Sequence, residues 1–484
     1  NSWYFRDELP QLITRIFIGL PLPLFLTAGF RRLYCNGTDY KSRKADDPIF
    51  KNITGIIAEY NPLHNGHLYH IRKTRENGSD GIIVALSSYF TQRGEPALLS
   101  KWDRAESALS AGANLVLELP AFFSCHNAGI FASGAVDILT ATGLVRSLSF
   151  GMEQPECDVE AILNILVQEP QYFKDNLKKF LNSGFSYVKA RAHALAAVRP
   201  EFGTFVSSPN NSLALAYMER IRKKGYPVTW NPVGRIGAGF HDICTEPSGF
   251  PSATAIRKNI REGKLNGLEN GIPESSAAVL SRCLDEGRIV ASRELLWRMA
   301  RYMLLGTPAS EIALSSEMTE GMENRFLKFA PESTSWDEFV SRCVTGRYPR
   351  GRVQRQLIHF LLGIRHDENR QLQESGPAYI RVLGADRGGL WMLRKMRKTS
   401  AIPVAGKHPV SGDRKLLMLS EIETRACRLW ETLTGVFSPG YEKKRRPLIR
   451  TEEYSGEEGN APEDGGTPRE EPFHGQAPRT GRSP

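Results

Sequence analysis

Short apolar runs alternate with amphipathic segments between residues 53 and 150 of this chain. The apolar runs are rich in Ile, Val and Leu and end at turn residues, which is typical of strands buried in a parallel sheet. The segments between them repeat apolar residues with the spacing of a helix that buries one face. Strands are predicted at 53–58, 81–86, 115–119 and 147–150, and helices from His67 onward, at 102–109 and at 128–139. This order predicts an α/β fold with a doubly wound, Rossmann-like parallel sheet.

A mostly helical region is predicted beyond Lys264, because apolar faces recur at Leu280, Leu284, 295–305 and 353–362. We therefore expect a second, mostly α-helical domain after the α/β domain. The predicted boundaries are 1–50 for a non-core N-terminal extension, 51–262 for the α/β domain, 263–438 for the helical domain and 439–484 for a disordered tail.

The two ends of the chain differ from its middle. The tail carries a basic cluster at 443–446 and then a stretch rich in Gly, Pro and Glu, a composition with too few apolar residues to bury a core. Near the start, an apolar stretch at 13–30 precedes Arg31 and Arg32. Proline and glycine interrupt that stretch and its length is modest, so no membrane anchor is expected.

Composition narrows the partners and the compartment. The 484 residues carry a net charge of +10, which suits a polyanion such as RNA, although an ordinary basic surface would give the same value. Seven cysteines are scattered without a CxxC pair. This favours a reducing cytoplasm and argues against a zinc ribbon.

The strand predicted at 53–58 runs directly into a turn that holds His64, Gly66 and His67. Gly66 lets the backbone approach a ligand, and the N–H groups of the helix that begins there favour an anion. The two histidines lie three residues apart, so both imidazoles can reach one phosphate as hydrogen-bond donors or as cations. A pair of polar turn histidines without a ligand is the alternative. No metal site is expected, because no cysteine lies at ligand spacing nearby.

The segment from Glu59 to His67, Glu-Tyr-Asn-Pro-Leu-His-Asn-Gly-His, resembles the HxGH signature of the nucleotidyltransferase superfamily, in the form found in the bacterial tRNA(Met) cytidine acetate ligases. Further blocks resemble that family in the same order, over about 53–435. They are 92–97, 100–102, 132–136, 150–153, 208–211, 235–242 and 252–257.

The resemblance implies a Rossmann-like HxGH nucleotidyltransferase domain followed by a helical tRNA-binding domain. It implies an enzyme that uses ATP, with Mg²⁺ as counter-ion, to convert acetate into acetyl-adenylate with release of pyrophosphate. The acetyl group is then transferred to the exocyclic amine of the wobble cytidine of elongator tRNA(Met). A cytoplasmic location is expected, without a membrane or a stable protein partner.

The same resemblance implies the site residues. His64, His67 and Arg257 are expected to be catalytic. The nucleotide is expected to bind Ile57, Ala58, Glu59, Tyr60, Asn61, Pro62, Leu63, His64, Asn65, Gly66, His67, Leu68, Tyr69, His70, Gly151, Asn210, Arg235, Ser252 and Thr254. Local alternatives stay open: Gly151 could form a plain tight turn, Asn210 and Asn211 could cap a helix that begins near Ser212, and Ser252 could be only a helix cap.

Two segments of the chain depart from the family's usual pattern. Ser88 and Tyr89 stand where Gly-Asn or Gly-Asp usually precedes the block at 90–94, and Met152 stands where the family usually has Ser. We expect these changes to alter the loop near the nucleotide and to remove a hydroxyl. Two other functions stay open: an adenylyltransferase that makes a dinucleotide cofactor, and a noncatalytic tRNA-binding protein that keeps a nucleotide pocket.

Arginines in the helical region are candidates for RNA contact. One group crowds a predicted helix start, and a second punctuates a later segment that also contains Tyr379 and Trp391. The groups are Arg347, Arg350, Arg352 and Arg355, and Arg381, Arg387, Arg394, Lys395, Arg397 and Lys398. A solvated helical face is the alternative for both.

Overall fold

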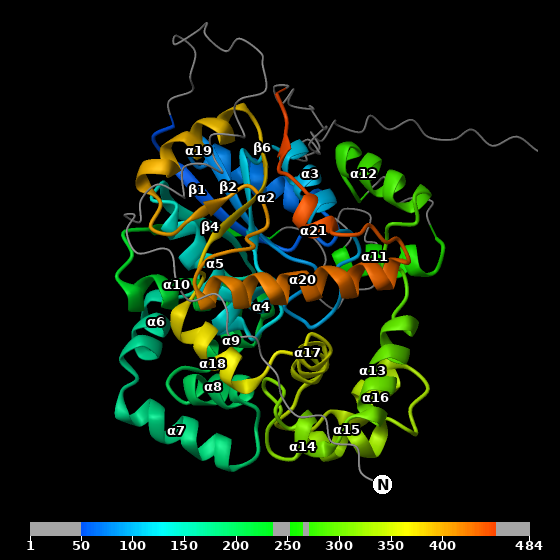
Figure 1. Ribbon diagram of the computed structural model, residues 1–484. Helices are drawn as coiled ribbons and strands as arrows, with labels where there is room; N and C mark the ends of the chain where they lie inside the picture. The colour runs from blue at the N-terminus through cyan, green and yellow to red at the C-terminus, as the bar shows by residue number, and fades with distance from the viewer. Residues whose placement is uncertain (1–49, 236–251, 265–270, 452–484) are drawn as a thin grey trace, which may run out of the picture. The chain divides into compact units, whose positions relative to one another are not determined.

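One sheet runs through the part of the chain described by this computed structural model, residues 50–235, 252–264 and 271–451 (Figure 1). Within these residues the strand order is β5-β4-β1-β2-β3-β6-β7, and β8 pairs with β6 as well. Neighbouring strands among β1 to β5 are parallel, whereas β6 is antiparallel to β3. The strands are β1 Ile53–Ala58, β2 Gly81–Ser87, β3 Leu115–Leu119, β4 Val145–Met152, β5 Thr229–Gly234, β6 Ile380–Ala385, β7 Val404–Ala405 and β8 Leu448–Ile449.

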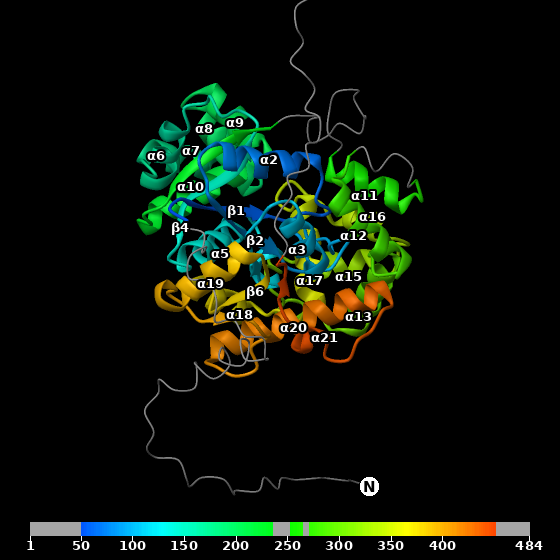
Figure 2. The ribbon, with the colours of Figure 1, turned by 90° about the horizontal axis from the view of Figure 1, so that it is seen from above.

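The central strands bury both faces because their apolar side chains alternate between two helical layers. Ile82, Val84 and Leu86 of β2 pack on the side of α2 (Asn65–Glu76) and α3 (Lys101–Ser110). Ile83 and Ala85 face the side of α5 (Ala128–Ala141) and α19 (Arg387–Thr399). Figure 2 shows α2 on one side of β1 and β2, with α5 and α19 on the other. The doubly wound parallel α/β arrangement predicted from the sequence is confirmed.

Apart from α2 and α3, the helices of the described residues fall into two groups along the chain. Those between β3 and β5 are α4 Ala121–Ser124, α5, α6 Val159–Gln168, α7 Gln171–Asn182, α8 Tyr187–Ala196, α9 Pro200–Ser207 and α10 Pro209–Lys224. Those after β5 are α11 Ala253–Arg261, α12 Glu274–Asp285, α13 Glu294–Gly306, α14 Ala309–Ile312, α15 Met322–Phe329, α16 Trp336–Cys343, α17 Arg350–Leu361, α18 His366–Ser375, α19, α20 Arg414–Thr434 and α21 Tyr441–Lys444. The second group confirms the mostly helical character expected beyond Lys264.

The helical region also contributes to the sheet. β6 lies in the stretch expected to be a separate helical domain, yet it pairs with β3 at the edge of the parallel strands. The chain divides into two units, residues 1–452 and 453–484, and every described residue lies in the first. The domain boundaries at 262 and 438 stay predictions.

The chain continues with regular structure past Pro439, where a disordered tail was expected. α21 buries Glu442, and β8 forms a parallel pair with β6. Residues 452–484 and the N-terminal extension up to residue 49 lie outside the described residues. The apolar stretch at 13–30 is among them. In the described ranges, no helix combines the length and the apolar character that a membrane crossing requires.

Candidate active site

The turn between β1 and α2 places His64 and His67 side by side. His64 is the N-cap of α2, with the extended backbone expected of a cap, and its Nδ1 accepts a hydrogen bond from the Gly66 amide at 3.1 Å. The amide of His64 donates in turn to Nδ1 of His67 at 3.3 Å. The two rings stack with their centroids 3.8 Å apart. The helix therefore begins two residues earlier than predicted, and the histidines form its capping box.

These contacts determine which ring nitrogen carries the proton. Nδ1 of each ring accepts a backbone N–H, so a neutral ring must carry its hydrogen on Nε2. Both Nε2–H groups are then available as donors to a ligand.

Burial keeps the imidazoles at this turn neutral. Burial lowers the pKa of His64 to about 3, and the charges of Arg235 and Arg257 add to the effect. Burial, with Arg235, likewise lowers the pKa of His70 to about 4. The pKa of His67 is lowered by burial and then by its neighbour His64. The sequence left two possibilities open, hydrogen-bond donation by neutral rings or positive charge on protonated rings. The lowered pKa values favour donation by neutral rings.

A cavity of about 560 Å³ opens at the carboxyl ends of β1, β4 and β5, which are neighbours in the sheet. Its size is in the range of small-molecule sites, ~300–1,000 Å³. The first turns of α2, α5 and α10 contribute to its wall, and so does Ser252, the N-cap of α11. Four helix N-termini around one cavity favour a ligand with several negative charges.

Most of the expected site residues line this cavity. They are Ile57, Ala58, Glu59, Tyr60, His64, Gly66, His67, Tyr69, His70, Gly151, Asn210, Arg235 and Ser252. The remaining ones lie outside the lining: Asn61, Pro62, Leu63, Asn65, Leu68, Thr254 and Arg257. Within this second set, Leu63 and Leu68 pack with the core between the sheet and α3, and the side chain of Asn61 accepts the amide of Leu98 at 2.8 Å.

Arg257 of α11 contacts the backbone of the turn that carries His64 and His67. One of its guanidinium nitrogens donates to the carbonyl of Asn61 at 2.8 Å, and the other lies 3.3 Å from the hydroxyl of Thr254. Arg257 therefore holds the backbone of the histidine turn in addition to placing positive charge near His64.

Only one of the two asparagines, Asn210, lines the cavity. α10 begins at Pro209, so both asparagines lie inside its first turn. The side chain of Asn211 is fully buried and accepts the Glu153 amide at 2.9 Å, so it does not face a nucleotide. Asn210 lines the cavity while its amide donates to Glu153 at 2.6 Å.

Sequence reasoning missed the wall that α5, α8, α9 and α10 contribute. Its residues are Ala128, Phe131, Val188, Val206, Ser207, Pro209, Ser212, Leu213 and Tyr217. Burial, with the charge of Glu59, raises the pKa of Tyr217, so this phenol stays protonated in the wall. Apolar residues at helical spacing look alike whether they face a core or a cavity. Only the packing of α8 on α9, of α9 on α10 and of α10 on β4 separates the two.

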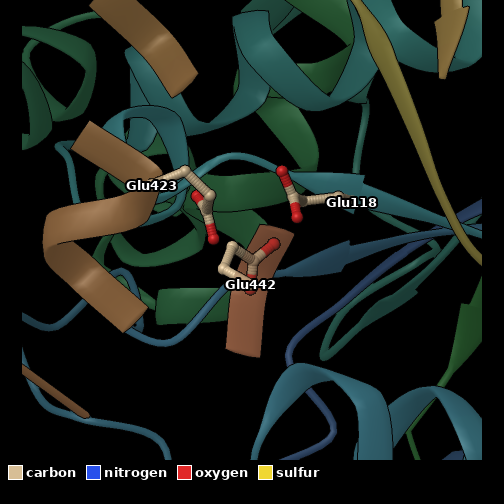
Figure 3. A group of neighbouring side chains, drawn as sticks. All are labelled: Glu118, Glu423 and Glu442. Carbon is tan, nitrogen blue, oxygen red and sulfur yellow. The ribbon is translucent and has the colours of Figure 1, made fainter. Parts of the chain in front are cut away.

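A buried group of three carboxylates has the spacing of a metal site but holds a lysine (Figure 3). Glu118 of β3, Glu423 of α20 and Glu442 of α21 point toward one another, and Lys101 pairs with all three. Its Nζ lies 2.7 Å from Glu423 and 2.8 Å from Glu442. Burial and the charges of Glu423 and Glu442 raise the pKa of Glu118, and the ammonium of Lys101 opposes that shift. The ammonium thus replaces a metal ion as the cation of the group.

The departures at 88–89 and 152 do not lie where we expected them. Ser88 donates to Glu423 of the carboxylate group, and Tyr89 donates to Glu442 at 2.8 Å. Met152 is 1% exposed and packs in the core. None of the three lines the cavity, and their effect on the loop near the nucleotide stays a prediction.

Part of the second predicted RNA-binding group is also wrong. Arg381 and Tyr379 are each 1% exposed, and Arg381 donates to the backbone carbonyl of Arg445 at 3.1 Å from within β6. Neither can contact RNA at the surface. On α19 the side chains of Arg387, Arg394, Lys395, Arg397 and Lys398 are exposed.

Comparison with known proteins agrees with this geometry. The profile of the HIGH Nucleotidyl Transferase family matches residues 51–442. A tRNA(Met) cytidine acetate ligase of Thermoanaerobacter sp. (strain X514) is 37% identical over 360 residues, 73% of this chain and 88% of the relative. The same enzyme of Leuconostoc mesenteroides is 33% identical over 81% of this chain and 98% of the relative. The chain belongs to the tRNA(Met) cytidine acetate ligase family.

Solved structures of the family share the fold. The apo crystal structure of Thermotoga maritima TmcAL superposes with a TM-score of 0.79 and 28% identity, covering 83% of this chain and 100% of that chain. A second form of that protein, bound with alpha-thio ATP, gives a TM-score of 0.77 at 27% identity and covers the same shares. The family and the fold expected from the sequence are thereby confirmed.

Proposed function

We propose that this chain is an ATP-dependent tRNA(Met) cytidine acetate ligase, whose cavity activates acetate as acetyl-adenylate and then acetylates a cytidine of elongator tRNA(Met). The observation that carries the proposal is the cavity itself, where the two Nε2–H donors of His64 and His67 join four helix N-termini. Relatives with this printed activity cover most of the chain, and the neighbour bound to an ATP analogue supports ATP as the nucleotide.

In the first half-reaction an acetate oxygen attacks the α-phosphorus of ATP, the bond to the bridging oxygen of pyrophosphate breaks, and acetyl-adenylate remains. His64 and His67 donate hydrogen bonds to phosphate oxygens on which negative charge increases, and the backbone N–H groups of the helix N-termini do the same. Arg235 lines the cavity and adds a positive charge. Arg257 acts mainly by holding the turn through the carbonyl of Asn61.

In the second half-reaction the exocyclic amine of cytidine attacks the acetyl carbonyl, AMP leaves, and the amine loses one proton. Positioning accounts for this step, and no covalent enzyme intermediate is needed. Mg²⁺ would supply positive charge to the triphosphate, and Glu59 would be its protein ligand, since Glu59 is the only acidic side chain among the described residues that line the cavity. The enzyme would act in the cytoplasm, where ATP and tRNA are present.

The test is acetate-dependent exchange of labelled pyrophosphate into ATP without tRNA. We expect the exchange to require acetate. The exchange rate should fall at least ~100-fold in His64→Ala and in His67→Ala, because each variant removes a hydrogen-bond donor to the charge that develops in the transition state. His193→Ala is the matched control, since His193 is an exposed histidine of α8 outside the cavity. Exchange that ignores acetate, or that survives loss of both histidines, would contradict the proposal. Nucleoside analysis of the reacted tRNA then identifies the acceptor.

A further inference from the structure

A buried arginine joins the carboxyl ends of the two central strands. Arg104 of α3 is fully buried, and its Nε donates to the carbonyl of Leu99 at 3.1 Å. Its Nη1 donates to the carbonyl of Glu59, the residue after β1, at 2.7 Å, and to that of Ser87, the last residue of β2, at 2.9 Å. Its Nη2 donates to the carbonyl of Ser88. Four backbone carbonyls thus converge on one guanidinium group.

This set of contacts suits arginine and no other side chain. A guanidinium group is planar and presents five N–H donors in a fixed fork, so it can hold carbonyls from several segments at once. Burial lowers the pKa of Arg104 to about 10, and the group therefore still carries its charge at neutral pH. A lysine would keep the charge, but its compact ammonium cannot reproduce the fork.

The carbonyl of Glu59 belongs to the peptide that precedes a strained residue. Tyr60 has a φ of 44°, in the left-handed region that residues with a bulky side chain rarely adopt. Rotation of the peptide between Glu59 and Tyr60 would change this φ and would turn the carbonyl away from Arg104. The hydrogen bond from Arg104 therefore holds the peptide in the orientation that the left-handed conformation requires.

The residue after Tyr60 is held as well. The side chain of Asn61 accepts the amide of Leu98 at 2.8 Å, and Arg257 donates to the carbonyl of Asn61 at 2.8 Å. A strained backbone conformation persists only where several surrounding contacts impose it. Contacts from α3, from the loop before α3 and from α11 meet this requirement at Tyr60.

The left-handed conformation places the Tyr60 ring against one of the two site histidines. Tyr60 is 1% exposed, and its ring meets the imidazole of His67 edge-on with the centroids 4.9 Å apart. The other neighbour of that imidazole is the ring of His64, stacked at 3.8 Å. The hydroxyl of Tyr60 is buried without a hydrogen-bond partner among the described residues. The contribution of Tyr60 at this position is therefore its ring, which packs against His67.

We propose that Arg104 and Tyr60 are positioning residues for the adenylation step. Arg104 holds the left-handed turn, and the Tyr60 ring then fixes the imidazole of His67 with its Nε2–H available to a phosphate. The effect on catalysis rests on the proposed function, whereas the effect on the His67 ring does not. The rival explanation is that Arg104 only stabilises the fold, since it also joins β2 to α3.

The experiment compares Arg104→Lys, Tyr60→Gly and the double variant in acetate-dependent pyrophosphate exchange without tRNA. Glycine adopts the left-handed conformation without strain, so Tyr60→Gly keeps the turn and removes the ring. We expect kcat to fall about 100-fold in Tyr60→Gly and about tenfold in Arg104→Lys, because small displacements of a reacting group are costly. In Arg104→Lys the KM for ATP should change less than about threefold, since Arg104 does not line the cavity.

The double variant separates positioning from general stabilisation. In the Tyr60→Gly background the turn is no longer strained and no ring remains to be placed. Arg104→Lys should therefore lower kcat by less than about twofold in that background, whereas two independent effects would multiply.

Arg325→Lys is the matched control. Arg325 also donates to backbone carbonyls, those of Arg342 at 2.7 Å and Cys343 at 3.0 Å, and it lies outside the cavity. Its exchange should stay within about twofold of the parent. Denaturant unfolding at pH 7 shows whether each variant is folded.

A spectroscopic measurement tests the ring without any turnover. In the parent, Nδ1 of His67 accepts the amide of His64, so ¹⁵N NMR of labelled histidine should show the proton on Nε2. Arg104→Lys should add a population of His67 with the proton on Nδ1, and Arg325→Lys should keep the signals of the parent.

Three outcomes would overturn the proposal. They are an equal factor of loss from Arg104→Lys in the parent and in the Tyr60→Gly background, an unchanged kcat with unchanged His67 signals in Arg104→Lys, and the same loss in Arg325→Lys. If the parent shows no acetate-dependent exchange, the proposed function fails. The His67 signals then decide alone: a second population in Arg104→Lys supports the positioning of the ring, and its absence overturns it.

Discussion

At Gly66 the absence of a side chain determines where a reacting group lies. A Cβ there would be 2.9 Å from Cε1 of His64 and 3.1 Å from its Nδ1, closer than side chains pack. The ring would have to leave the Gly66 amide, and its Nε2–H would leave the cavity with it. The backbone conformation does not require glycine at this position, because φ at Gly66 is not in the left-handed region. The close approach of the His64 ring is therefore what requires the glycine of the HxGH signature.

Gly66→Ala should therefore lower acetate-dependent pyrophosphate exchange by on the order of 100-fold, since a displacement of about 1 Å at a reacting group can cost that much. The stability cost should be modest, about 1 kcal/mol, for the lost cap. Gly306→Ala is the control, because a Cβ at the end of α13 meets no heavy atom within 4 Å. Equal exchange by the two variants would contradict this explanation of Gly66.

The low pKa values at the histidine turn predict a pH dependence. Because the pKa of His64 is about 3 and that of His70 about 4 in the folded protein, the unfolded chain binds protons first as pH falls. The free energy of unfolding should thus decrease as pH drops from about 6.5 to about 4. In ¹⁵N NMR of the protein without nucleotide, the rings of His64 and His70 should stay neutral down to about pH 5. The proton of His64 should lie on Nε2. A titration midpoint near 6.5 for either ring would contradict the assignment.

Among the elements, α3, β3, α20 and α21 meet at the buried carboxylate group (Figure 3). Lys101 begins α3 and is fully buried, and burial alone would lower its pKa. The three carboxylates reverse that shift and hold its pKa above the usual value. The group therefore joins a strand of the nucleotide-binding sheet to two helices near the C-terminal end of the described chain.

Lys101→Met should lower the free energy of unfolding by about 3–5 kcal/mol, because it leaves buried carboxylates without their cation. Denaturant unfolding at pH 7 measures the change. Lys73→Met is the matched control, since Lys73 forms an exposed pair with Glu76 on α2 and should change the free energy of unfolding far less than Lys101→Met. If a metal ion rather than Lys101 neutralised the group, a chelator would destabilise the parent protein and Lys101→Met would have little effect.

On the scale of the whole molecule, the last described segment of the chain packs against the α/β sheet formed by its first part. β6 pairs with β3 on one side, and β8 pairs with β6. Glu442 of α21 reaches Lys101, more than three hundred residues earlier in the sequence. The segment after Gly435 is thus part of the fold that carries the cavity.

A chain that ends after Gly435 should lose about 3–5 kcal/mol of unfolding free energy, because it removes Glu442 from the buried group and takes the partner strand β8 from Gly384 and Ala385 of β6. Thermal or denaturant unfolding compares it with a chain that ends after Thr451, which keeps α21 and β8. Equal midpoints for the two chains would show that the last segment contributes nothing to the fold.

The local sequence pattern was sufficient to predict the central strands and the histidine turn of the α/β domain. The bounds of β1 and β3 agree with the predicted ranges, and the cavity gathers thirteen of the expected nucleotide-binding residues around the histidine turn. Buried parallel strands, helix caps and the HxGH turn are specified by residues close together in sequence, so a single stretch of chain carries the signal. The order of strands and helices then places their functional ends on one edge of the sheet.

Long-range packing decided the rest. Arg381 and Tyr379 look like surface residues of a basic segment, yet antiparallel pairing of β6 with β3 buries them. Ser88 looks like a loop residue near the nucleotide, yet it donates to a carboxylate on α20. The wall formed by Val188, Val206 and Tyr217, and the grouping of Lys101 with three glutamates, depend on contacts between distant segments. Such contacts leave no periodicity in the sequence, because the free energy that selects them comes from burial and charge pairing in the folded chain.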